Sequence, residues 1–111
     1  MQDQHELGPV VRDALLPGEG VEALARATDS VLAVTDRRFI VATGNRLALD
    51  LPLEQVRRIQ FDIEKRRPAT LVIVPEVPGH DPQVLAIPAE ELERTARALT
   101  LVGARLAMLD D

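Results

Sequence analysis

Short runs of apolar and β-branched residues follow one another along most of this chain, and turn signals rather than helices separate them. Two of the runs alternate between apolar and polar residues, RLALDL at 46–51 and RIQFDIE at 58–64, as strands with one buried face do. Parallel strands need long crossover connections, which are usually helical. The pattern therefore predicts about seven short antiparallel strands and excludes a βαβ architecture.

The alternation also predicts which side chains of these two runs are buried. In each run the residues of one parity are apolar, and we expect them to face the core while their neighbours face water. The predicted buried residues are Leu47, Leu49 and Leu51 in the first run and Ile59, Phe61 and Ile63 in the second.

Two segments carry helical signals. From Pro88 to about residue 109, apolar residues recur every three or four positions, which predicts one long amphipathic helix. A short helix is predicted for residues 7–16, with Pro9 near its start. Residues 21–28 stay ambiguous, because helix-favouring residues lie there between two turn signals. The predicted buried stripe of the long helix is Leu92, Ala96, Leu99, Gly103 and Leu106.

Composition narrows the class of protein. A chain of 111 residues suits one domain, and a net charge of −5 argues against a nucleic-acid partner. The absence of cysteine excludes disulfides and thiolate metal sites. No apolar run approaches the ~20 residues of a membrane span, and the first residues lack a signal-peptide pattern. We therefore expect a soluble cytoplasmic protein.

Residues suited to catalysis or metal binding do not occur in usable combinations. Ser30 is the only serine and lacks a nucleophile-elbow context, and no phosphate-binding glycine spacing is present. His80, Asp81 and Glu76 offer one imidazole and two carboxylates, which is thin coordination for a metal. An exposed loop is the simpler interpretation. We predict a protein that is not an enzyme and that uses no cofactor and no metal.

The most basic segment spans residues 57–67, where five cations accompany only two acids. One interpretation is a patch that binds an anion or a partner. The other is a solvated hairpin whose charges protect a strand edge, which is the commoner role of a charge run. The segment lacks the aromatic residues on which single-stranded nucleic acids stack. The candidate binding residues are Arg57, Arg58, Lys65, Arg66 and Arg67.

Two further features have both a functional and a plain interpretation. In Asp36-Arg37-Arg38 we expect the aspartate to shape a turn and the arginines to pair locally with acids. The other feature is a candidate interaction surface made of an apolar loop together with unpaired strand edges. Its loop residues are Val74, Pro75, Val77 and Pro78. The plain interpretation of this surface is an edge that the N-terminal helix shields.

The order of several short motifs resembles that of the bacterial pleckstrin-homology-like (PH-like) domains. The motifs are LLPGE at 15–19, VTDRR at 34–38 and LPLEQVRRIQF at 51–61, and the resemblance extends over residues 15–109. It implies that residues 21–28 form the first strand. It also implies a mainly β (α+β) fold, in which two orthogonal antiparallel sheets form a seven-stranded, partly open barrel capped by the C-terminal helix.

The resemblance also implies a domain division and a kind of function. Residues 1–16 would be an N-terminal extension with a short helix, and residues 17–109 a single PH-like domain. Such a domain is a binding or scaffolding module, whose expected partner is a protein or a second copy through sheet edges and loops. The alternative is peripheral binding to an anionic membrane through the basic hairpin 57–67. The first inter-strand loop, Thr28-Asp29-Ser30, carries an acid where phosphoinositide-binding relatives carry basic residues, which puts that lipid site in doubt.

Overall fold

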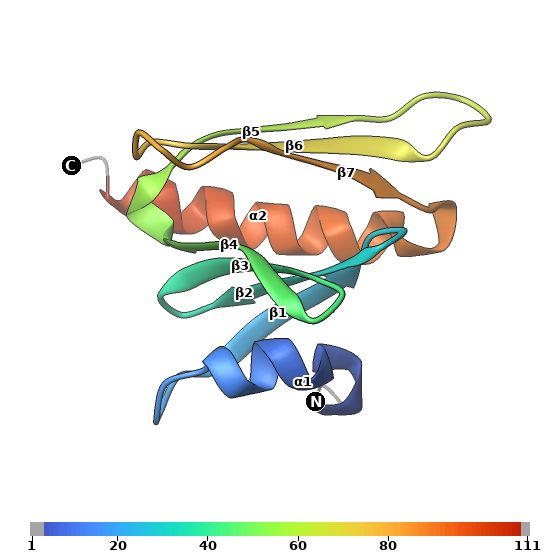
Figure 1. The fold of residues 1–111 in the computed structure, drawn as a ribbon. Coiled ribbons are helices and arrows are strands. Elements are labelled where there is room, and N and C mark those ends of the chain that lie inside the picture. Colours follow the sequence, from blue (N-terminus) through green and yellow to red (C-terminus); the bar gives the residue numbers. More distant parts are fainter. Residues whose placement is uncertain (1–3, 110–111) are drawn as a thin grey trace.

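The protein is described by a computed structural model that covers residues 4–109, with side chains from 8 to 108 (Figure 1). Seven strands lie between two helices along the chain. Their bounds are α1 Gln4–Ala14, β1 Val21–Arg26, β2 Ser30–Thr35, β3 Arg38–Thr43, β4 Arg46–Pro52, β5 Val56–Asp62, β6 Ala69–Pro75, β7 Gln83–Ile87 and α2 Leu92–Leu109, with short 3-10 turns at Leu53–Gln55 (η1) and Ala89–Glu91 (η2).

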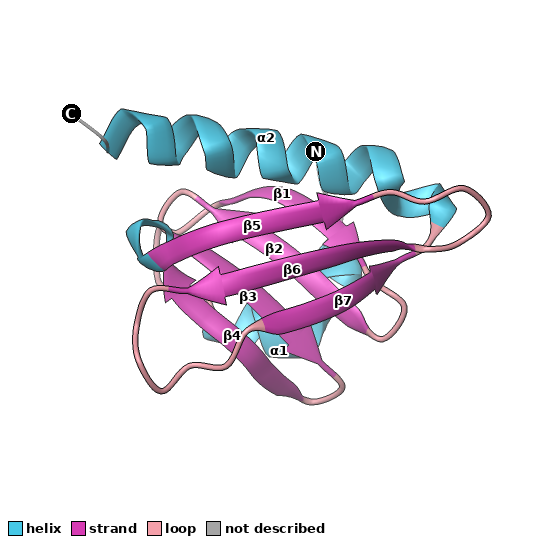
Figure 2. Ribbon diagram, turned by 90° about the horizontal axis from the view of Figure 1, so that it is seen from above, coloured by secondary structure: helices cyan, strands magenta, loops and turns pink. Residues whose placement is uncertain are grey.

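The strands form two antiparallel sheets, one in the order β1-β2-β3-β4 and one in the order β5-β6-β7. The sheets cross face to face, and α2 lies along one side of the sandwich (Figure 2). A backbone hydrogen bond from Thr28 N to Ala86 O, at 2.8 Å, joins the β1–β2 turn of one sheet to β7 of the other, whereas the bond from Glu76 N to Gln55 O at 2.7 Å extends the pairing of β5 with β6. The arrangement confirms the predicted mainly β fold of two antiparallel sheets with a C-terminal helix, and the two sheets do not close into one barrel.

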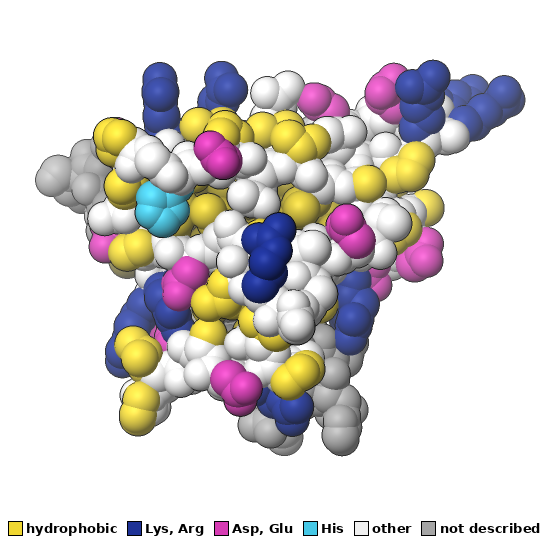
Figure 3. Space-filling model, viewed as in Figure 1, with side chains coloured by type: hydrophobic (Ala, Val, Ile, Leu, Met, Phe, Trp, Pro, Cys, Tyr) yellow, Lys and Arg dark blue, Asp and Glu magenta, His cyan; other side chains and the backbone are white. Residues whose placement is uncertain are grey.

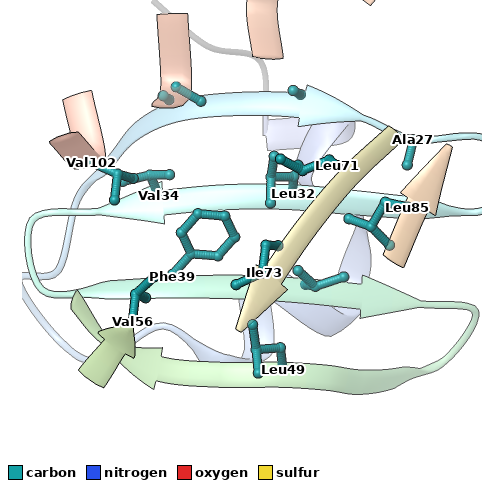
Figure 4. Close-up of a cluster of buried hydrophobic side chains, with 14 of the residues drawn as sticks. Ala27, Leu32, Val34, Phe39, Leu49, Val56, Leu71, Ile73, Leu85 and Val102 are labelled. Atoms are coloured by element: carbon teal, nitrogen blue, oxygen red, sulfur yellow. The ribbon is translucent and has the colours of Figure 1, made fainter. Parts of the chain in front are cut away.

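The main hydrophobic core lies between the two sheets and α2. Phe39, Leu32 and Val102 point into it from the first sheet and the helix, and Leu71 and Ile73 from the second sheet (Figure 4). All five side chains are fully buried. The core consists almost wholly of aliphatic side chains, as the composition requires.

A second hydrophobic cluster lies on the opposite face of the four-stranded sheet. Helix α1 covers that face with Val11, which packs against Leu24, Ala33 and Ile40 (Figure 1). Strands β2 and β3 are therefore buried on both faces, which explains why their sequences are continuous apolar runs rather than alternating ones. In contrast, no helix covers the outer face of the β5-β6-β7 sheet in the described part of the chain (Figure 2).

The ambiguous segment and the short helix differ in part from the sequence prediction. Residues 21–26 form strand β1, as the family resemblance implies and against their helical propensity. Helix α1 spans Gln4–Ala14 rather than residues 7–16, and its backbone leaves helical geometry at Gly8, where φ is 75°. Pro9 follows directly and begins the second helical segment, a position that suits its fixed φ and missing N–H.

The predicted burial of the alternating runs is correct in part. Leu49 and Leu51 face the core, but Leu47 is exposed. The register of β4 against β3 shifts between Leu49 and Leu47, so Ala48 is an extra residue and the side chain of Leu47 falls on the other face. Ile63 follows the end of β5 and is 63% exposed, contrary to its predicted burial.

Helix α2 is shorter and rotated compared with the prediction. The predicted start at Pro88 is replaced by the turn η2, and α2 begins at Leu92. Ala96 and Gly103 of the predicted stripe are exposed, whereas Thr95, Ala98 and Val102 form the fully buried line. Alanine, glycine and threonine are all small, so the apolar period alone could not distinguish the two neighbouring lines.

Candidate functional site

The motif LLPGE forms a tight turn that buries an acidic side chain. Glu19 N donates to Leu16 O at 3.0 Å, and Gly18 between them has φ +80°. Proline followed by a glycine with positive φ is the signature of a type II turn. The turn directs the Glu19 carboxylate into the protein, where the side chain is fully buried beside Arg38.

The motif VTDRR forms the second half of this arrangement. Thr35 Oγ1 accepts the backbone N–H of Arg37 at 3.0 Å and of Arg38 at 2.8 Å, and it donates to Glu19 Oε2 at 2.7 Å. Thr35 therefore shapes the turn between β2 and β3, and the prediction that Asp36 does so is wrong. Asp36 Oδ1 is buried without a hydrogen-bond partner among the described residues.

Arg38 connects Glu19 to two other parts of the fold, β4 and the end of α1. Its Nη2 and Nε donate to the two oxygens of Glu19 at 2.6 and 2.9 Å, and its Nη1 lies 2.9 Å from both oxygens of Asp50 in β4. Nη2 also donates to Ala14 O at the end of α1, at 2.8 Å. Of the two arginines in this motif, Arg37 is the one that pairs with its neighbour in sequence: its Nε lies 3.7 Å from Asp36 Oδ2. The predicted local pairing is therefore wrong for Arg38.

The charge state of this network follows from its hydrogen bonds. The hydrogen bond from Arg38 is the largest effect and lowers the pKa of Glu19 to about 2, although burial acts in the opposite direction. Glu19 in turn raises the pKa of Arg38 above its ordinary value. Each Glu19 oxygen accepts two hydrogen bonds, which uses the acceptor capacity of a carboxylate. The network therefore holds the fold together and leaves no free acceptor on Glu19 for a ligand.

The stability of the protein should fall in acid because of Glu19. Its pKa is about 2 when folded and 4.5 ordinarily, so its stabilisation is complete above pH 4.5 and is lost as pH falls from 4.5 towards 2. The difference corresponds to about 3 kcal/mol. Urea unfolding at a series of pH values should show this loss, and Glu19→Gln should remove it. The same slope in the Glu19→Gln variant would contradict the assignment.

The predicted basic residues separate into two groups. Arg57 and Arg58 lie at the start of β5, and Lys65, Arg66 and Arg67 lie in the loop beyond its far end. At ~3.4 Å per residue, the strand between Arg58 and the loop spans about 14 Å. Dark blue side chains accordingly stand at both ends of the upper sheet in Figure 3. The five residues do not form one continuous patch.

The loop group lies beside an exposed apolar side chain and an apolar hollow. Ile63 projects at the start of the same loop, and a hollow of about 470 Å³ lies at the base of the hairpin. Arg66 has φ +67°, a left-handed conformation that is unusual for a residue other than glycine. The residues that line the hollow are Glu64, Arg66, Arg67, Pro68, Pro88, Ala89 and Leu92.

The predicted apolar loop surface is not continuous. Pro75 is buried, Val74 and Val77 are half-buried, and Pro78 is exposed. Val74 instead belongs to the outer face of the β5-β6-β7 sheet. Its neighbours there are Val72 and Val84, which pair across β6 and β7.

We call Val72, Val74 and Val84 the valine face. Val84 is 67% exposed, the other two valines are half-buried, and yellow side chains lie between the two basic ends in Figure 3. Sequence reasoning missed this surface because β6 and β7 have apolar residues on both faces. Such a pattern is usual for a strand covered on both sides.

Side chains of the loop between β1 and β2 form hydrogen bonds with other residues of this chain. Ser30 Oγ lies 2.9 Å from Thr43 Oγ1 and donates to Asp29 Oδ1 at 3.1 Å, and Thr28 Oγ1 donates to Ala86 O. Residues 27–30 contain no basic side chain, and Asp29 adds an acid, so the loop itself lacks the cations with which proteins usually bind phosphate groups.

Two further observations concern metals and membranes. His80 and Asp81 are exposed, and within the described residues no three histidine, cysteine or acidic side chains gather where they could hold a metal ion. Neither described helix is both long and apolar enough to cross a bilayer.

Comparison with known proteins shows the fold class. The sequence matches no protein-family model and no curated protein. The structure is similar to the crystal structure of a pleckstrin homology domain from Shewanella amazonensis, with a TM-score of 0.65 and 13% sequence identity. The similarity covers 95% of this chain and 99% of that one. The chain therefore has the fold of a bacterial PH-like domain, as its motifs imply.

Proposed function

We propose that this PH-like chain is a non-enzymatic binding module that associates with a second copy of itself through the valine face. The observation that carries the proposal is the difference between its two sheets. Helix α1 covers the outer face of β1-β2-β3-β4, whereas the valine face has no cover in the described part of the chain (Figure 2). Exposed apolar surface with a polar rim is typical of interaction sites.

The charges around the valine face are arranged so that the face complements itself. Arg58 pairs with Val74 at one end of β5, and Asp62 pairs with Thr70 at the other end. Consider a two-fold axis that lies in the plane of this face and runs perpendicular to the strands. It places β5 of the second copy over β5 of the first, with the opposite strand direction. Arg58 then lies opposite Asp62 of the second copy, and Val84 lies opposite Val84.

The face is a better surface for association than the neighbouring edge of β7. Ala86 O at that edge is already bonded to Thr28 N, and prolines stand on both sides of the strand at 82 and 88. Proline cannot donate a hydrogen bond to an added strand. This leaves Val84 as the main residue through which β7 could accept another strand.

Light scattering over a range of protein concentrations up to millimolar tests the proposal. We expect a dimer that Val84→Asp weakens about tenfold or more, because the change places two like charges opposite each other in the interface. Met108→Ser removes an exposed apolar side chain elsewhere on the surface and should leave the dimer unchanged. Arg58→Asp and Asp62→Arg should each weaken it, and combining the two should restore it. A monomer at every concentration would contradict self-association.

A second candidate function is peripheral attachment to an anionic membrane through the loop 63–67. The observation that favours it is the exposed Ile63 beside three consecutive cations, because an apolar anchor and basic residues act together at a bilayer surface. Arg57 and Arg58 lie about 14 Å away along β5 and are not part of this loop.

Sedimentation with phosphatidylglycerol vesicles at low salt tests this second function. Each cation near such a surface contributes about 1 kcal/mol, so reversing Arg66 and Arg67 to glutamate should weaken binding at least about tenfold. Ile63→Ser should weaken it as well, whereas Arg46→Glu in β4 should have little effect. Binding that survives the double reversal would exclude this loop as the contact.

A further inference from the structure

Arg66 has a backbone conformation that is otherwise found only at glycines in the described part of the chain. Its φ is +67°, and the other residues with positive φ are Gly8, Gly18, Gly44 and Gly79. A side chain raises the free energy of such a conformation, whereas glycine adopts it without strain. Strained residues of this kind cluster at functional sites. The arginine at position 66 therefore points to a role for its side chain.

The loop 63–67 carries positive charge that the fold does not use. Lys65, Arg66 and Arg67 are exposed, and their side chains form no hydrogen bond or ion pair with the described residues. The loop also contains one acid, Glu64, so three cations and one acid leave a net charge of +2. The loop can therefore bind an anion without breaking an ion pair of these three cations.

An apolar surface lies beside these cations at the base of the hairpin. Ala69 pairs with Ile87, so Pro68 and Pro88, which adjoin this pair, lie next to each other where the ladder ends. The two prolines line the hollow of about 470 Å³, a volume within the range of ligand sites. The hollow combines apolar side chains with two guanidinium groups. Its other lining residues are Glu64, Arg66, Arg67, Ala89 and Leu92.

The charge and the apolar lining together select the chemistry of a ligand. Guanidinium groups bind phosphate oxygens through paired N–H donors, and a phosphate monoester carries a charge of about −1.5 to −2 at pH 7. Such a group balances the net charge of the loop, whereas a carboxylate would leave half of that charge unbalanced. The side chains of the prolines and Leu92 form no hydrogen bonds, so the part of the ligand that lies on them is apolar.

We infer that this hollow binds a phosphate monoester that carries a short apolar chain. The phosphate group lies between Arg66 and Arg67, and the apolar chain lies on Pro68, Pro88 and Leu92. The inference deepens the second proposed function and rests on the same loop, but it does not require a membrane, because the hollow holds a single ligand molecule. The ligand supplies the partner that Arg66 lacks among the described residues.

Titration of the nitrogen-15 labelled chain with hexyl phosphate, followed by NMR, tests the inference. We expect the amides of residues 64–67 and 89–92 to shift. Hexyl phosphate should bind at least about tenfold more tightly than inorganic phosphate, a difference that the burial of about two methylene groups supplies. Hexanol, which lacks the phosphate group, should not bind measurably.

Arg66→Gly separates a binding role of this side chain from a structural one. The variant should unfold at the same urea concentration as the original chain or a higher one, because glycine adopts a positive φ without strain. It should nevertheless bind hexyl phosphate at least about tenfold more weakly, as expected when a charge-assisted hydrogen bond is lost. Arg46→Gly makes the same change at an exposed arginine of β4 and should leave the affinity unchanged. Ala89→Trp, which fills the hollow from an exposed position, should remove the advantage of hexyl phosphate over inorganic phosphate.

Vesicles distinguish the source of the phosphate group and separate this inference from membrane attachment. Tighter binding to phosphatidic acid than to phosphatidylglycerol at equal surface charge would identify a lipid headgroup as the ligand. Equal binding to both kinds of vesicle, with hexyl phosphate still bound in solution, would identify a free molecule. Vesicle binding without any preference for hexyl phosphate over inorganic phosphate would support membrane attachment alone and overturn the inference. The inference is also overturned if the Arg66→Gly variant binds hexyl phosphate as tightly as the original chain.

Discussion

Replacing Glu19 with alanine should lower the free energy of unfolding by about 3–5 kcal/mol. The change leaves the largely buried Arg38 without two of its hydrogen bonds, and it also removes the acceptors of Thr35 Oγ1 and Leu16 N. Breaking a buried ion pair from one side is costly because the remaining charge stays out of water. Urea unfolding followed by circular dichroism at pH 7 measures the effect.

A double-mutant cycle shows whether the loss belongs to the pair. Glu19→Leu combined with Arg38→Met replaces both charges by apolar groups, and it should cost clearly less than the sum of the two single changes. Arg37→Met is the matched control, because Arg37 is exposed and pairs only with its neighbour. A loss for Glu19→Ala of less than about 1 kcal/mol, the range of a surface pair, would show that the network does not stabilise the fold.

Replacing Val11 with aspartate should lower the free energy of unfolding by about 3 kcal/mol and release α1 from the sheet. Val11 is fully buried against Leu24, Ala33 and Ile40, and no cation among the described residues lies in that cluster to pair with a carboxylate. Thermal and urea unfolding measure the loss. Faster amide exchange in β2 and β3 would report that the outer face of the sheet has become accessible.

The neighbouring position provides the control for Val11. Arg12→Asp introduces the same side chain on the exposed face of α1 and should change stability only slightly. If Val11→Asp has no more effect than Arg12→Asp, α1 does not contribute to the stability of the domain. Residues 1–16 would then behave as an extension that can be removed.

The sequence predicts most of the strands because they are local features. Each strand pairs with its neighbour along the chain, and each hairpin has turn residues of its own, such as Gly44 with φ +62°. Strand β1 is different, because VEALAR favours a helix and becomes a strand only by pairing with β2. Leu47 is different as well, because its face depends on a bulge that the alternating pattern does not reveal.

The candidate sites were harder to predict because their parts are distant in sequence. Arg38 is 19 residues from Glu19 and 12 from Asp50, so no local pattern links the three. The basic run 57–67 is continuous in sequence, but an extended strand separates its two ends in space. The valine face depends on which sheet α1 covers, and a groove beside β1 depends on where α2 docks. Neither arrangement can be derived from the spacing of residues.

The contacts that join the two sheets have a consequence for the rate of folding. Each hairpin joins residues that are close in sequence. In contrast, the bond between Thr28 and Ala86 joins residues 58 positions apart. The bonds to β1 from Glu91, in the turn before α2, and from Arg105, in α2, span 65 and 83 positions. Loop closure costs entropy before such contacts form. We therefore expect β1-β2-β3-β4 to form early and the docking of α2 on β1 to be the slow step.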